Sequence, residues 1–292
     1  MGARERRNNL LGWLFITPPI VIFGIFIFAP MGVALFVSLH KWNLLSSMKF
    51  VGLKNYVRMF HSESFWNSLR VSLIYVLGTV PTSVIFAMIL AILMNQKIYG
   101  LSFFRIMIYL PVITSMAAAA IVFQYLFEPE FGFVNFVLSS IGLPKMKWLN
   151  DPNQALFALI IVGIWKRVGY NTIILLAGLQ AIPSVYYEAA KIDGANNSQV
   201  VRKITIPLLS PVTFFVTIMQ IIASLKVFTS IVVMTEGGPA GGTEAIPYYL
   251  YKNAFQYHKM GYASAVAYVL FAIIFIFTLL QFKFGEKKVH YQ

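Results

Sequence analysis

Long apolar stretches separated by short polar intervals dominate this chain. A helix crosses the ~30 Å hydrocarbon core of a bilayer with roughly 20 residues, at about 1.5 Å of rise each. The apolar runs therefore predict an all-α polytopic membrane protein with six transmembrane helices. We place these spans near residues 10–39, 71–95, 106–127, 155–182, 207–235 and 263–282.

The first apolar run is interpreted as a span and not as a cleaved leader. It is longer than the apolar core of a signal peptide, and no convincing A-x-A cleavage site follows it. Because proline interrupts helical hydrogen bonding, Pro18, Pro19 and Pro30 are expected to kink this span.

The distribution of lysine and arginine gives the orientation. If the N-terminus is inside, the cytoplasmic segments carry these residues at about twice the density of the outer loops. We therefore predict cytoplasmic N and C termini, with a basic segment at 1–9, one transmembrane domain at 10–282 and a tail at 283–292. The polar interval 184–206 then lies on the cytoplasmic side.

The composition excludes several classes of function. The chain is 59% hydrophobic and only 11% charged, whereas soluble domains carry about 25% charge. Membrane topology and anionic headgroups explain the net charge of +13 better than nucleic acid does. The absence of cysteine excludes disulfides and thiolate chemistry, and the four histidines lack H-x-x-x-H spacing, so no metal site is predicted.

The acidic residues indicate that the energy source lies outside this chain. All ten carboxylates fall outside the predicted spans, whereas secondary transporters usually carry proton or sodium relays within the membrane. No G-x-x-x-x-G-K-[ST] loop is present either, so this chain is expected to bind no cofactor, with ATP and Mg handled by another polypeptide. An autonomous carrier or channel remains the alternative. A membrane-embedded enzyme is disfavoured, because no acid pair, Ser/His/Asp set or metal set lies at membrane depth.

The polar interval between the fourth and fifth spans, YYEAAKIDGANNSQVVRKITIP, is patterned as two helix ends. Ser184 is expected to be the N-cap of a short helix that ends near Ile192. Gly194 follows where a left-handed residue is favoured. Asn196 and Gln199 have the spacing of a capping box that opens the next helix.

The short helix carries an apolar stripe that needs a partner. Val185, Ala189 and Ile192 lie on one face at i, i+4 and i+7. A helix of about nine residues is marginal in water unless it packs against something. Glu188 is available for an ion pair. These features alone fit two interpretations equally well. The helix could dock to a protein partner, or it could lie on the lipid headgroups.

The interval resembles the EAA---G---------I-LP signature of ATP-binding-cassette importer permeases. Ile206 stands where that pattern has leucine. In that family the segment is the coupling helix, which sits in a cleft of the ATP-hydrolysing subunit. The resemblance implies that this chain contacts its ATPase through Glu188, Ala189, Ala190, Asp193, Gly194, Ile204 and Pro207.

The resemblance extends to the carbohydrate branch of the family, of the maltose-permease type, over most of residues 15–282. The extra N-terminal spans and the large outer insertion of the maltose permease are missing. The likeness implies the type I ABC importer permease fold in a prokaryotic plasma membrane, with an oligosaccharide as solute, or a glycerol phosphate as in one relative. It also implies three kinds of partner: a second similar permease, two copies of an ATP-binding subunit and an extracytoplasmic solute-binding protein. It rests on matches at Phe50–Tyr56, 165–195, Thr235–Pro239 and Gly261–Ala265.

Polar residues of the fourth and fifth spans are candidates for contact with the solute. Sugar sites combine aromatic faces with amide, hydroxyl or guanidinium groups. The faces that bear them resemble those lining the sugar site of the maltose permease, although hydrogen bonding between helices is the alternative for each residue. Lys166 and Arg167 have a further alternative, which is to snorkel to the outer interface, and the role of Lys226 is left open. The candidates are Gly163, Arg167, Tyr170, Asn171, Gln220 and Ser224.

Overall fold

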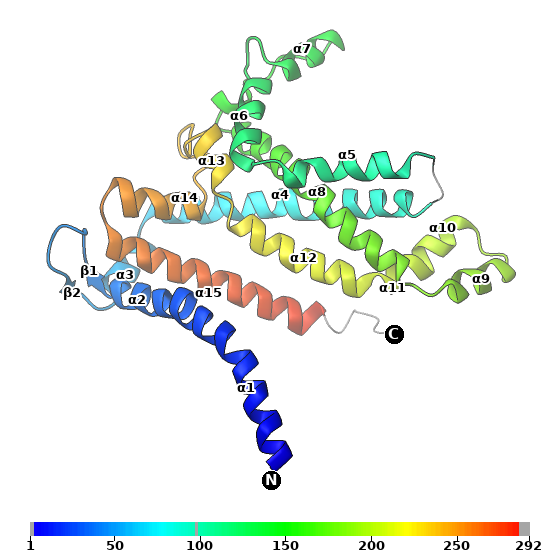
Figure 1. The fold of residues 1–292 in the computed structure, drawn as a ribbon. Coiled ribbons are helices and arrows are strands. Elements are labelled where there is room, and N and C mark those ends of the chain that lie inside the picture. The colour runs from blue at the N-terminus through cyan, green and yellow to red at the C-terminus, as the bar shows by residue number, and fades with distance from the viewer. Residues whose placement is uncertain (1–2, 97–98, 286–292) are drawn as a thin grey trace. The chain divides into compact units, whose positions relative to one another are not determined.

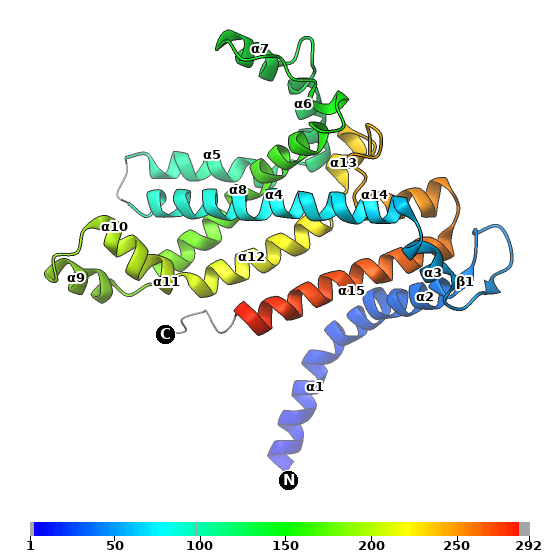
Figure 2. The same ribbon diagram turned by 180° about the vertical axis from the view of Figure 1, so that it is seen from behind.

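The computed structural model describes residues 3–96 and 99–285, almost all of them helical or in short connections (Figures 1 and 2). Parts of the predicted terminal segments, residues 1–2 and 286–292, lie outside the described residues. The chain divides into two compact units: one holds the residues up to Ser62 together with Leu250–Val269, and the other holds Glu63–Tyr249 and the residues from Leu270 on.

The first unit begins with a long apolar helix. It runs as α1 (Ala3–Phe23), a π-helical turn η1 (Gly24–Phe28) and α2 (Ala29–Ser38). Pro18 and Pro19 lie inside α1, and the irregular turn comes just before Pro30. Proline has no backbone N–H, so one hydrogen bond of the helix is lost at this point, and the π-helical turn accommodates that loss.

The other elements of this unit close around the C-terminal end of α2. The strands β1 (His40–Lys41) and β2 (Lys49–Phe50) pair antiparallel, and α3 (Lys54–Phe60) follows. Asn55 Nδ2 donates to the carbonyl oxygens of Ser38 at 2.7 Å and of His40 at 3.0 Å, which satisfies acceptors left over at a helix end. The unit also contains the π-helical turn η4 (Lys252–Gln256) and the first residues of α15 (Met260–Gly285).

The second unit contains most of the helices. α14 (Ile246–Tyr251), like α15, contributes residues to both units. The remaining elements are α4 (Glu63–Met94), α5 (Leu101–Ile113), α6 (Met116–Leu126), α7 (Phe133–Ser140), the 3₁₀ turn η2 (Trp148–Asn150), α8 (Ala155–Gln180), α9 (Ser184–Ile192), α10 (Asn197–Val200), the π-helical turn η3 (Val201–Thr205), α11 (Ile206–Leu208), α12 (Ser210–Leu225) and α13 (Thr229–Met234).

The core of the second unit lies where α4, α8 and α12 pack against one another, with α5 against α8 (Figures 1 and 2). Small residues on α4 allow the helices to approach closely, which is how helices associate in membranes. Buried leucines of α8, together with Leu209 at the N-cap of α12 and Val216 within α12, fill the remaining space. This cluster contains Ala87, Ala91, Met94, Leu175, Leu176, Leu179, Ile182, Leu209 and Val216.

Six spans are present when each bent helix pair is taken as one span, as the sequence pattern predicted. The described residues hold four helices long and apolar enough to cross a membrane: Gly12–Ser38, Glu63–Met94, Ala155–Gln180 and Met260–Lys283. Two further candidates are pairs bent by 99° and 63°, Leu101–Ile113 with Met116–Leu126 and Asn197–Leu208 with Ser210–Leu225.

The third span is not the continuous helix predicted for 106–127. Helix α5 ends at Ile113, and Thr114 and Ser115 adopt extended backbone with ψ of 139° and 131° before α6 begins. Pro111 lacks the N–H that would continue the hydrogen-bond ladder, which weakens the helix just before the break.

The fifth span is also shorter than the predicted 207–235. The helical pair bends at Leu209, where Pro211 removes a backbone donor from the first turn of α12. At the other end, α12 stops at Leu225, residues 226–228 are not helical, and α13 is a separate short helix. The regular span is therefore Ser210–Leu225.

Candidate functional site

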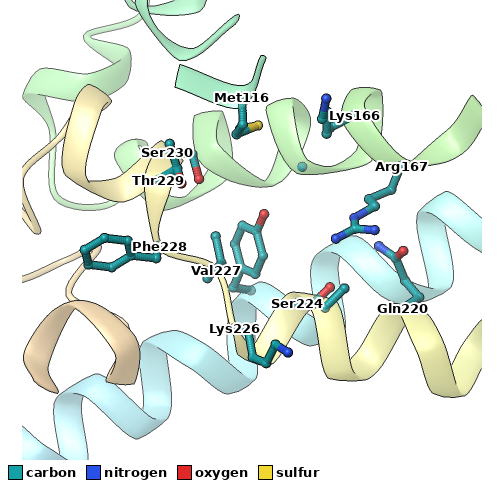
Figure 3. A pocket seen from close by; sticks show the side chains of 13 residues that line it. Met116, Lys166, Arg167, Gln220, Ser224, Lys226, Val227, Phe228, Thr229 and Ser230 are labelled. Carbon is teal, nitrogen blue, oxygen red and sulfur yellow. The ribbon is translucent and has the colours of Figure 1, made fainter. Parts of the chain in front are cut away.

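A pocket of about 200 Å³ opens between α4, α8 and α12, and its lining also includes Met116 of α6 and the segment leading into α13 (Figure 3). Four of the six residues predicted to meet the solute line it, from two different helices. Gly163 and Arg167 come from α8, and Gln220 and Ser224 come from α12. The rest of the lining is Tyr75, Met116, Lys166, Ala223, Lys226, Val227, Phe228, Thr229 and Ser230.

The other two predicted residues, Tyr170 and Asn171, are not part of the lining. Tyr170 is half-buried on α8. Asn171 is buried, and its Nδ2 donates to Oε1 of Gln220 at 3.4 Å. Asn171 therefore hydrogen-bonds to the side chain of a pocket residue on the neighbouring helix, and this contact fits the interhelical role that the sequence left open for it.

The α4 wall of the pocket comes from Tyr75, which the sequence did not single out. A Cβ atom at Gly163 would lie 2.3 Å from the Tyr75 hydroxyl, so the glycine is what lets this tyrosine approach α8. Ser224 is fixed from the same side, because its hydroxyl lies 3.1 Å from that of Thr79. The sequence does not mark Tyr75 as a pocket residue, because it lies in an otherwise apolar run. Only the folded packing of α4 brings it next to α8.

The segment after α12 supplies five consecutive lining residues: 226–228, which are not helical, and then Thr229 and Ser230, the first residues of α13. In a regular helix, five successive side chains would point around the whole circumference. The break brings all five of them to the pocket, and Lys226 is one of these lining residues. No proline or glycine marks the break, so the sequence pattern favoured a continuous span here.

The side chain of Lys166 is held at the break of the third span. Its Nζ donates to the carbonyl oxygens of Pro111 at 2.7 Å, Val112 at 3.2 Å and Thr114 at 2.5 Å. These carbonyls lie at the end of α5 and have no partners further along the helix. A single ammonium group from α8 thus satisfies the exposed acceptors of the broken span.

The second candidate site is the loop that carries α9. The helix begins at Ser184, with Pro183 in the N-cap position and no side-chain cap, so the expected Ser184 N-cap is wrong by one residue. Its C-terminus is a Schellman motif: Ala195 N–H donates to Ala190 O at 2.9 Å and Gly194 N–H to Lys191 O at 3.1 Å. The loop thus has a fixed turn of the kind predicted.

The turn leads directly into a second fixed helix start. Asn196 and Gln199 form the predicted capping box, with both hydrogen bonds at 2.9 Å. Gly194 has φ of +74°, a left-handed conformation that glycine adopts without the penalty of a side chain. The two capped ends make the connection from α9 to α10 stiff over very few residues.

The predicted apolar stripe of α9 is exposed. Val185 is 60% exposed and Ile192 86%, and both Ala189 and Glu188 are also exposed. Tyr187, on the opposite side of α9, packs against the hydrophobic core of α4, α8 and α12. The helix is therefore held by Tyr187 and presents its stripe outward.

A groove of about 530 Å³ lies beside the stripe, between α9 and the helical turns after it. Ala189, Ala190, Asp193, Gly194 and Ile204 of the predicted coupling residues line it, whereas Glu188 and Pro207 do not. The other lining residues are Tyr186, Ala195, Gln199, Val200 and Lys203. Five of the seven predicted coupling residues thus share one concave surface, and Glu188 is exposed on α9.

Comparisons with known proteins agree on the class of this chain. Residues 60–288 match the model of the family described as "Binding-protein-dependent transport system inner membrane component". A probable ABC transporter permease protein of Bacillus subtilis, YesP, is 40% identical over 292 residues, which covers 98% of this chain and 94% of the relative. The trehalose/maltose transport system permease protein MalF of Thermococcus litoralis is 34% identical over 284 residues, covering 96% and 95%.

A solved structure shows the same fold. A chain of a bacterial alginate ABC transporter, crystallised with its periplasmic protein bound to an alginate pentasaccharide, superposes with a TM-score of 0.85 over 99% of each chain. The sequence identity to that chain is 23%, so this likeness concerns the fold.

Proposed function

The chain belongs to the family of binding-protein-dependent transport system inner membrane components, and we propose that it forms one half of the translocation pathway of an ATP-driven sugar importer. It is a transport subunit of a prokaryotic plasma membrane and not an enzyme. The observation that carries the proposal is α9, whose apolar stripe is exposed while its opposite side is fixed to the core. The names of the sugar-transporting relatives support the substrate class.

Alternating access is the mechanism that this geometry supports. An ATPase that closes on ATP moves α9, and the capped turns at Gly194 and Asn196 transmit the displacement to α12 without slack. The pocket between α8 and α12 then opens to one side of the membrane or the other. The energetic step is a shift of population between two packed states.

The assembly has three further components. The family works with a solute-binding protein, as its description states. We propose in addition a second, similar permease and two copies of an ATP-binding subunit, whose clefts receive the coupling residues Glu188, Ala189, Ala190, Asp193, Gly194, Ile204 and Pro207. ATP and Mg are bound by those subunits, and this chain binds no cofactor of its own.

Reconstitution tests this function. We expect liposomes that contain the two permeases and the ATPase to take up a sugar only when ATP and the binding protein are both supplied. Liposomes that contain this chain alone should show no flux. ATP-independent flux through the chain alone would favour the alternative of an autonomous carrier or channel. Uptake of glycerol phosphates but not of sugars would favour the glycerol-phosphate alternative.

The proposed orientation, with both termini in the cytoplasm, has a direct test. The chain has no native cysteine, so a single introduced cysteine is the only reactive thiol. Lys145 and Ile192 are both exposed. In intact spheroplasts, a membrane-impermeant maleimide should label the Lys145→Cys variant and leave Ile192→Cys unlabelled until the membrane is opened. The reverse pattern contradicts the orientation.

A further inference from the structure

Two cationic side chains of the pocket face no acidic residue. Arg167 projects from α8 and Lys226 from the end of α12, and Figure 3 shows Arg167 directed toward Gln220. Among the residues that the structure describes, the thirteen that line the pocket include no aspartate or glutamate. The pocket is therefore positively charged.

The neighbouring Lys166 differs from Arg167 because its charge is satisfied by hydrogen bonds within the protein. Its ammonium group is held by three backbone carbonyls at the end of α5. Arg167, one residue further along α8, turns to the pocket instead. Of the three cations in the lining, Lys166 has a structural task, whereas Arg167 is half-buried and directed toward Gln220, and Lys226 is exposed at the end of α12.

Ionisable groups inside a membrane are costly and usually pair with an opposite charge. Since the lining offers none, we propose that the counter-charge belongs to the solute, and that this pocket takes a sugar bearing an anionic group, either a carboxylate or a phosphate. This inference rests on the proposed function and names the substrate class of the same site. The planar fork of Arg167 suits both groups, because each presents two oxygens to it.

The remaining lining fits the neutral part of such a solute. Ser224, Thr229 and Ser230 offer hydroxyl groups, Gln220 offers an amide, and Tyr75 offers an aromatic ring. Hydroxyl and amide groups exchange hydrogen bonds with sugar hydroxyls, and an aromatic face packs on C–H groups. The pocket lining thus combines groups that suit a neutral sugar with the two cations Arg167 and Lys226.

Binding to the assembled permease–ATPase complex, without the binding protein, isolates the contribution of this pocket. Three labelled probes separate the possible solutes: trigalacturonate, galactose 6-phosphate, and neutral trigalactose. We expect at least one anionic probe to bind roughly tenfold or more tightly than trigalactose, as one added charge-assisted hydrogen bond implies. The preference should weaken as salt is raised.

Variants assign the preference to the two cations. Arg167→Gln and Lys226→Gln should each lower affinity for the anionic probe by about tenfold more than they lower affinity for trigalactose. Lys145→Gln, at an exposed position outside the pocket, is the matched control and should change neither. Equal binding of all three probes, absence of anionic binding, or an equal loss for charged and neutral probes would overturn the inference.

Uptake separates a failure of this inference from a failure of the proposed function. If the reconstituted importer takes up trigalactose with ATP and does not take up the anionic probes, the sugar importer stands and the inference is wrong. If no sugar of any kind is taken up with ATP and the binding protein, the proposed function itself fails, and the inference falls with it.

Discussion

Gly194→Pro is expected to reduce transport-coupled ATP hydrolysis of the assembled complex to its uncoupled level. The native φ of +74° is incompatible with proline, which is fixed near −65°. The substitution also removes the N–H that donates to Lys191 O at 3.1 Å. Loss of the Schellman motif costs about 3 kcal/mol locally and leaves α9 attached to α10 by a slack connection. Uptake and ATP hydrolysis are measured together in liposomes.

Gly142→Pro is a closely matched control on a different loop. Gly142 has φ of +77°, donates its N–H to Ser139 O at 3.1 Å, and has open space around it, as Gly194 does. It should suffer the same local strain and still hydrolyse ATP in a transport-dependent way. Glu188→Lys tests the docking surface without a backbone change, because Glu188 is exposed. Full coupling in both Gly194→Pro and Glu188→Lys would remove α9 from the mechanism.

The parts of the fold that the sequence predicted are those set by local chemistry. The left-handed Gly194 and the Asn196–Gln199 capping box depend on residues within a few positions of one another, and both are present. Span lengths follow from bilayer thickness, and four long helices match the predicted runs. Only Ser184 differs by one position, because Pro183 occupies the N-cap without offering a side-chain acceptor.

The extended backbone at Thr114 and Ser115 and the break at Lys226 could not be predicted from local chemistry alone. Thr114 and Ser115 are ordinary helix residues, and their extended conformation is stabilised by Lys166, which is more than fifty positions away. No proline or glycine near Lys226 indicates that the helix ends there. A straight span and a bent span have the same pattern of apolar residues, so the pattern cannot tell them apart. The bends are set by tertiary contacts.

The candidate pocket was predicted in part for the same reason. Residues on one face of one helix, such as Gly163 with Arg167, or Gln220 with Ser224, follow from helical spacing. Tyr75 is brought in by the packing of α4 on α8, and residues 226–230 by the break after α12. Asn171 lies on α8, as Arg167 does, but it is outside the pocket lining and its side chain is buried against Gln220.

Lys166→Met is expected to destabilise the bend between α5 and α6. Methionine fills a similar volume but donates no hydrogen bond, so the carbonyls of Pro111, Val112 and Thr114 lose their donor at once. The three carbonyl groups are part-buried, so the loss of their shared donor is expected to cost about 1 kcal/mol, at the lower end of the range for an unpaired acceptor. A lower midpoint of thermal unfolding of the purified complex reports this destabilisation.

The geometry of the bend distinguishes this anchoring role from a general loss of stability. Phe104 on α5 and Val122 on α6 are both exposed, and a chain without native cysteine accepts spin labels there through Phe104→Cys and Val122→Cys. The distance between the labels should be narrowly distributed in the native background and become broad with Lys166→Met. Lys145→Met, which removes an exposed lysine, should leave both distance and unfolding midpoint unchanged. A narrow, unshifted distance in Lys166→Met would mean that Thr114 and Ser115 keep their extended backbone without the ammonium group, and that the bend is set by packing alone.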